Sequence, residues 1–214
     1  MNLLPRLTAS RGRTLRQTAE RLGLVYFGGV DHNQDEHDAV RGLTVSTTHR
    51  DKHFAVGTYD GYDIAIVDRY DTTKLPGAKT VTHNWAILQV SLAPRQHLPH
   101  LFFLPLHRES TFAHLFTSTR QLAPARQYLT ETFPLAFASR YQLYVRPSDA
   151  ATLDQDLLQK LLPQLAAYFW PHAVEMQDNK IFVYLIEHRL DEAVLQSAIQ
   201  SALWLAELVE NHTD

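Results

Sequence analysis

Two runs rich in β-forming apolar residues, Phe54 to Tyr59 and Tyr62 to Tyr70, predict two strands joined by a tight turn. Asp60-Gly61 separates the two arms. A two-residue type I′ turn needs a positive φ angle at both central residues, and Asp-Gly is one of the pairs that favour it. Side chains alternate between the faces of a strand, so the second arm places Tyr62, Ile64 and Ile66 on one face. The other face receives Asp63, Ala65, Val67 and Arg69.

Two periodicities, that of a strand and that of a helix, predict the remaining elements. A period of two predicts strands at 80–92 and 140–146 and a hairpin formed by 173–177 and 181–187. Helical spacing predicts helices at 10–22, 153–170 and 191–210. Gly23 is expected to end the first helix, Pro163 to kink the second or start a new one, and Asp191 to cap the third.

This order of elements predicts an α+β fold with mostly antiparallel sheet pairing. An N-terminal helix precedes several strands, and the chain closes with a strand-helix-strand-strand-helix unit. We expect residues 1–214 to form a single unit. The alternative is two lobes, a β-rich lobe with the N-terminal helix at 1–105 and the strand-helix-strand-strand-helix lobe at 137–214, since the pattern is weakest between them.

Composition excludes several classes of chemistry. The chain has no cysteine, which removes disulfides, thiolate metal ligands and cysteine nucleophiles and fits a reducing compartment. A formal net charge of −3 gives no general attraction to nucleic acid, and no specific nucleic-acid binding is expected. No apolar leader and no apolar run long enough for a membrane span is found, so we expect a cytoplasmic protein.

Basic residues gather on the first predicted helix, where Arg11, Arg13 and Arg16 are accompanied only by Glu20 as an acidic residue. Positive charge near a helix N-terminus opposes the helix dipole, so these arginines do not serve to stabilise the helix. One interpretation is a solvated face. The other is a contact for an anionic partner, either a protein or the anionic inner surface of a membrane.

The most polar stretch of the chain, at 31–38, offers candidate metal ligands. His32, Asp35 and His37 are residue types that bind zinc, manganese or iron. Their spacing follows neither a His-Glu-x-x-His helix nor a calcium-binding loop. A metal-dependent hydrolase using this loop is therefore the alternative to a solvated acidic loop.

Motifs of other enzyme classes are missing. The chain contains no Gly-x-Ser-x-Gly nucleophile elbow and no phosphate-binding glycine loop, since Gly28-Gly29 is an isolated pair. No cofactor is predicted. His83 and Trp85, on one face of a strand, are candidates to line a pocket or, alternatively, ordinary core and rim residues. Tyr59 and Tyr62 are expected to pack across the turn.

The final third of the chain resembles an uncharacterised bacterial domain-of-unknown-function family. A phenylalanine-led strand, an acidic turn, a leucine-rich helix and a short hairpin make up the motif, represented here by Phe137 to Val145, Asp149, Leu157, Leu158, Leu165 and Ile181 to Leu185. Val56 to Gly61 with Ile64 to Asp68 is similar to that family's central hairpin. Its members are often membrane-associated and sometimes occur beside LemA-like proteins. The resemblance implies the α+β fold and assigns no catalytic residue.

Missing catalytic motifs and a basic helix beside an acidic loop favour a non-catalytic protein that binds a macromolecular partner. Arg11, Arg13 and Arg16 are the candidate contacts. A homo-oligomer, in which the acidic loop meets the basic helix of a second copy, is a further hypothesis.

Overall fold

The computed structural model describes residues 4–29, 50–73, 80–95, 97–109, 112, 122–129, 133–185 and 190–213. The principal helices are α1 (Leu4–Leu22), α3 (Leu135–Ala138), α4 (Gln155–Gln164) and α5 (Glu192–Thr213). The strands are β1 (Val25–Gly29), β2 (Arg50–Tyr59), β3 (Tyr62–Thr73), β4 (Val81–Ser91), β5 (Leu98–Pro105), β6 (Ala123–Pro124), β7 (Tyr141–Val145), β8 (Ala173–Asp178) and β9 (Lys180–Leu185). Short helical turns are η2 (Leu106–Arg108), η4 (Ala125–Gln127), η5 (Pro147–Thr152) and η6 (Leu165–Phe169). The predicted α+β class is confirmed.

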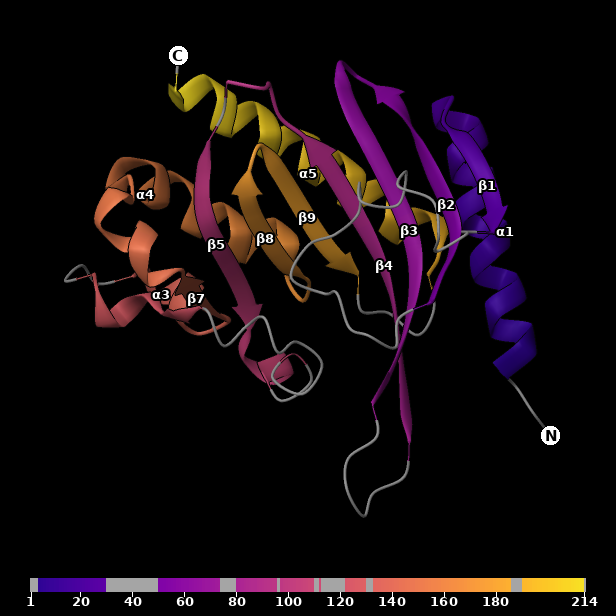
Figure 1. Ribbon diagram of the computed structural model, residues 1–214, viewed down its shortest axis with the longest axis horizontal. Helices are drawn as coiled ribbons and strands as arrows, with labels where there is room; N and C mark the ends of the chain where they lie inside the picture. Colours follow the sequence, from indigo (N-terminus) through magenta and orange to yellow (C-terminus); the bar gives the residue numbers. More distant parts are fainter. Residues whose placement is uncertain are drawn as a thin grey trace.

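The strands form one nine-stranded sheet in the order β1-β2-β3-β4-β9-β8-β5-β7-β6. Each described pair of neighbouring strands is antiparallel. The C-terminal hairpin β8-β9 lies between β4 and β5, so strands from the last part of the chain separate two strands that are consecutive in sequence (Figure 1). Strand β4 is an interior strand, as the apolar residues on both of its faces predict.

Each face of the sheet has its own apolar cluster. Helices α1, α4 and α5 cover one face, where Ile64 and Ile66 of β3 join residues such as Leu15, Leu161 and Leu205. Figure 1 shows α5 running across this face. The opposite face contains Ala65, Val67, Trp85 and Tyr184, which pack with Phe112 and Leu122. Strand β3 is therefore covered on both sides, in agreement with its predicted alternation.

The β2-β3 hairpin turns at Asp60-Gly61 as predicted, with φ angles of 53° and 82°. Glycine adopts this conformation without a steric penalty, and aspartate tolerates it better than most residues. Tyr59 and Tyr62 pair directly across the turn. Near the start of β2 the pairing register with β3 shifts between Lys52 and Ala55, where His53 adopts a φ of 56°. This bulge, which the alternating pattern does not reveal, turns the His53 ring toward α1.

Particular residues mark the ends and the irregular turns of helices α1, α4 and α5. Asp191 caps α5 by accepting a hydrogen bond of 2.8 Å from the Val194 backbone N–H, as predicted. Helix α4 continues through Pro163, and the backbone then changes to the π-helical turn η6. Helix α1 starts at Leu4, earlier than predicted, and Gly23 follows its end with a φ of 72°.

Candidate functional site

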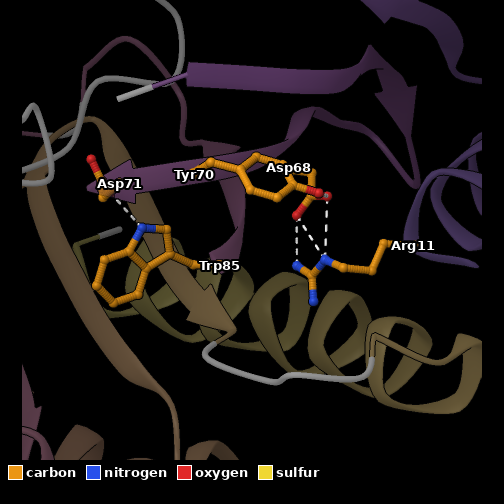
Figure 2. A network of polar contacts seen from close by, with 5 residues as sticks. All are labelled: Arg11, Asp68, Tyr70, Asp71 and Trp85. Atoms are coloured by element: carbon orange, nitrogen blue, oxygen red, sulfur yellow. Dashed lines mark hydrogen bonds and ion pairs between the residues drawn. The ribbon is translucent and has the colours of Figure 1, made fainter. Parts of the chain in front are cut away.

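The first candidate contact, Arg11, lies inside the protein. Its side chain is 2% exposed, and its Nη2 donates to Asp68 Oδ1 at 2.6 Å while its Nε donates to the same oxygen at 3.0 Å. The Tyr70 hydroxyl donates to Asp68 Oδ2 at 2.9 Å, so a short network joins α1 to β3 (Figure 2). Burial, the Asp68 charge and this hydrogen bond raise the pKa of Tyr70. Arg11 thus belongs to the interior and not to an exposed basic face.

The two other candidate arginines lie at the surface. Arg13 is exposed, and Arg16 is exposed while donating to Glu20 at 2.8 Å one turn later on the helix. The hydrogen bond to Glu20 and its charge raise the pKa of Arg16. The hypothesis that this helix contacts an anionic partner therefore stays a prediction, now for Arg13 and Arg16 without Arg11.

The candidate metal ligands His32, Asp35 and His37 lie outside the described residues. Among the residues that the structure does describe, no group of three or more His, Asp or Glu side chains is placed to hold a metal ion. The metal-dependent hydrolase stays a prediction that concerns the 31–38 loop alone.

A second set of buried polar contacts lies on the opposite face of the sheet. Arg69 donates to both carboxylate oxygens of Asp51, at 2.7 and 2.6 Å, and the Trp85 indole donates to Asp71 at 2.6 Å (Figure 2 shows the latter pair). His83 stacks on Trp85, with ring centroids 5.9 Å apart. These side chains hold β2, β3 and β4 together, so Trp85 is a core residue rather than the wall of an open pocket.

A third polar cluster joins β5, β8 and β9. Glu175 is fully buried and accepts hydrogen bonds from the Tyr184 hydroxyl and from His100 Nε2, the latter at 2.8 Å. Arg146 Nη2 lies 3.2 Å from His100 Nδ1. A guanidinium only donates, so Nδ1 is the acceptor and Nε2 carries the proton given to Glu175. His100 and Glu175 are buried, and Arg146 is the partly exposed member of this cluster.

An open surface hollow lies beside α5. It occupies about 490 Å³ between the β2-β3 turn and the outer side of α5. Its walls are Tyr59, Asp60, Tyr62, Gln200, Leu203, Trp204 and Glu207. Trp204 remains 38% exposed although its neighbours Leu203 and Leu205 are buried. The apolar stripe of α5 therefore faces the sheet, and Trp204 stands on the solvent side of the helix.

The hairpin turn fixes one wall of this hollow. Tyr59 and Tyr62 are half-buried against the core on the helix side of the sheet. The Tyr62 hydroxyl donates to Glu210 Oε2 at 3.1 Å, and the other oxygen of Glu210 accepts from the Ala93 backbone N–H at 2.6 Å. Glu210 thereby fastens both the hairpin and the segment after β4 to α5, which keeps the two walls of the hollow at a fixed separation.

A second hollow of about 330 Å³ continues on the other side of Trp204. Lys160, Leu208, Asn211 and His212 line it together with Trp204 and Glu207, which both hollows share. Tyr168 of η6 packs on Trp204 with ring centroids 5.8 Å apart and is 62% exposed. We refer to the residues lining the two hollows, with Tyr168, as the Trp204 surface.

The electrostatics of the first hollow are acidic. The pKa of Tyr62 is raised to about 12, mainly by burial, then by the hydrogen bond to Glu210 and by the charges of Glu210, Glu207 and Asp60. Among the residues that the structure describes, none of those lining this hollow is basic. Negative charge and aromatic rings therefore occur together at one exposed position.

The periodicity of α5 contained a signal for this surface. The apolar residues that recur at helical spacing in the last helix exclude Trp204, although it is the largest apolar side chain of that helix. A tryptophan outside the stripe of a helix that covers a sheet is either exposed or in contact with another element. Tyr59 and Tyr62 were predicted correctly as a cross-turn pair, but their approach to α5 depends on contacts between distant parts of the chain.

Comparison with known proteins gives a fold and no family. No protein-family model matches the chain, and no curated protein matches it. Among solved structures, the chain is similar to the crystal structure of the mycobacterial trehalose monomycolate transport factor A, TtfA, with a TM-score of 0.53 and 13% identity. The similarity covers 92% of this chain and 93% of that one. Within the described residues, no helix combines the length and apolar character needed to cross a membrane.

Proposed function

We propose that this protein acts by binding a second protein through the Trp204 surface, without catalysing a reaction. The observation that supports this most directly is the position of Trp204, which is 38% exposed and forms the wall shared by two adjacent hollows. Single exposed apolar residues are common on protein surfaces. An exposed tryptophan packed on an exposed tyrosine, with a hollow on each side, is instead typical of the aromatic anchors found at interfaces.

Rigidity of the surface also supports a binding role. Buried residues of α5 fix the helix on the sheet, and Glu210 holds the hairpin against it. Because its walls are held in place before binding, the surface loses little conformational freedom when a partner docks. A shape fixed in advance favours recognition of one partner over many.

Site-specific photo-crosslinking in cells that naturally produce the protein tests this function. A photoreactive amino acid replaces Gln200, which lines the first hollow, while Trp204 stays in place. We expect a covalent adduct with one defined protein, and we expect Trp204→Ala to reduce its yield at least about 10-fold, since truncating a central aromatic anchor costs about 2 kcal/mol or more.

Tyr128, which is 44% exposed and not part of the Trp204 surface, provides the matched control position. The same photoreactive residue at 128 should not give that adduct. The proposal fails if position 200 gives no protein adduct, or if the yield is the same with and without Trp204 while both variants show equal thermal unfolding.

A further inference from the structure

The first hollow of the Trp204 surface combines two features that favour one kind of ligand. Aromatic rings of Tyr59, Tyr62 and Trp204 line it, and the carboxylates of Asp60 and Glu207 lie in the same lining. The face of an aromatic ring attracts cations through its quadrupole, most strongly for tryptophan. Carboxylates attract cations by charge, so both features act in the same direction.

The raised pKa of Tyr62 reflects the same negative charge. Glu210, Glu207 and Asp60 each raise the pKa of its hydroxyl, in addition to the effect of burial. Their charges raise it because a phenolate would be repelled by the neighbouring carboxylates. The field that disfavours an anion at Tyr62 favours a positive group in the adjoining space.

Other occupants fit the hollow less well. An anionic group would meet Asp60 and Glu207 without any basic residue in the lining to compensate. An apolar side chain would cover these carboxylates without giving them a partner, and burying an unpaired charge is costly. A guanidinium is planar, stacks on tryptophan and forms paired hydrogen bonds with a carboxylate, so it satisfies rings and charges together.

We propose that this hollow receives an arginine side chain of the protein partner, with the guanidinium against Trp204 and paired with Glu207. This inference rests on the proposed function and specifies the chemistry of its partner. The hollow of about 490 Å³ lies within the range of about 300–1,000 Å³ that ligand pockets occupy, so it has room for the side chain and its flanking backbone.

Nuclear magnetic resonance of the tryptophan indole N–H groups tests the proposal. The chain has three tryptophans, and Trp204→Phe identifies the signal of interest. The probe is the blocked tripeptide Gly-Arg-Gly, titrated to about 50 mM because a few such contacts amount to millimolar affinity. Its uncharged counterpart, Gly-citrulline-Gly, has nearly the same shape. We expect the arginine peptide to shift the Trp204 signal and to bind at least about 5-fold more tightly than the citrulline peptide.

Two variants of α5 complete the test. Glu207→Gln should weaken binding of the arginine peptide about 3- to 5-fold, whereas Glu192→Gln should leave it unchanged. Glu192 also lies on α5 but pairs with Arg21, away from the hollow. Raising the salt concentration should weaken binding in the wild type, because exposed charge pairs are screened.

The outcomes separate this inference from the proposed function. Equal binding of the two peptides, or no movement of the Trp204 signal by either, overturns the arginine site. A Trp204-dependent crosslink at position 200 would in that case leave the protein-binding function standing. Conversely, charge-dependent peptide binding without any crosslink retains a cation site and removes the proposed function.

Discussion

Arg11 has a structural role in α1 that the exposed Arg13 and Arg16 do not share. It lies four residues before Leu15 and eight before Ala19, and both of these residues are buried. Residues at this spacing share one face of a helix. The apolar stripe therefore continues through an arginine, which is acceptable in the interior only because Asp68 neutralises it. Arg13 and Arg16 lie off the stripe and remain exposed.

Removing the charge of Asp68 should destabilise the protein strongly. Asp68→Asn keeps the size of the side chain but removes the carboxylate that pairs with the buried Arg11 guanidinium, a change that costs about 3–5 kcal/mol. The free energy of unfolding from urea titration measures the loss. Glu20→Gln, which removes the exposed partner of Arg16, is the control and should leave the unfolding midpoint unchanged. A loss below about 1 kcal/mol for Asp68→Asn would show that the pair does not hold α1 on the sheet.

At the scale of the elements, the docking of α1 depends on a close approach between a glycine and a histidine. A Cβ atom at Gly12 would lie 2.5 Å from Cε1 of His53. The imidazole has little freedom to move, because the Tyr26 hydroxyl lies 2.7 Å from its Nδ1 and the two rings are stacked. The bulge in β2 and the glycine in α1 thus form one fitted contact.

A double-mutant cycle tests this contact. Gly12→Ala alone should destabilise by about 1–3 kcal/mol, although alanine is the better helix former, because the new methyl group overlaps the ring. In a His53→Asn background the overlap is removed, and the same change should stabilise by about 0.5–1 kcal/mol. Asparagine suits the positive φ at position 53. Thermal unfolding of the four proteins gives the coupling, and stabilisation by Gly12→Ala alone would contradict it.

Most helices and strands are predictable from the sequence, because each depends on the pattern of a few neighbouring residues. The Asp-Gly turn, the strand at 140–146 with Tyr141, Leu143 and Val145 buried, and the Asp191 cap all follow from a few neighbouring residues. The bulge near His53 and the π-helical turn after Pro163 do not. The bulge turns His53 toward partners that are distant in sequence, whereas Pro163 signals only that the helix is disturbed and not the π-helical form that follows it.

At the scale of the whole molecule, local pattern predicts which strands are interior but not the order of the strands in the sheet. Apolar residues on both faces of β4 indicate an interior strand, and β4 lies between β3 and β9 in the sheet. Nothing in the local pattern indicates that β8 and β9 enter the sheet between β4 and β5. The Trp204 surface depends on this arrangement, because the order of the sheet brings α5 alongside the β2-β3 turn. None of the site residues predicted from the sequence lines this surface, and only Tyr59 and Tyr62 were expected to lie together.

The stability of the molecule should fall in mildly acidic solution, because the partly buried His172 is neutral in the folded state. Burial, with a contribution from the charge of Arg108, lowers the pKa of His172 to about 4. Its Nδ1 is buried without a hydrogen-bond partner among the described residues. The unfolded chain has an ordinary histidine pKa of about 6.5, so between these values the unfolded state binds the extra proton. Stability is therefore fully present above about pH 6.5 and decreases as the pH falls toward 4.

From pH 7 to pH 5 this difference amounts to a loss of about 2 kcal/mol in the free energy of unfolding. His172→Asn should reduce the decrease by about that amount, because asparagine does not titrate. Burial also lowers the pKa of His53, His83 and His107, so a smaller decrease of the same sign should remain. Urea titrations at pH 7 and pH 5 measure the slope of the free energy of unfolding against pH in the wild type and in His172→Asn. Equal slopes in the two proteins would mean that His172 binds its proton as readily in the folded state as in the unfolded state.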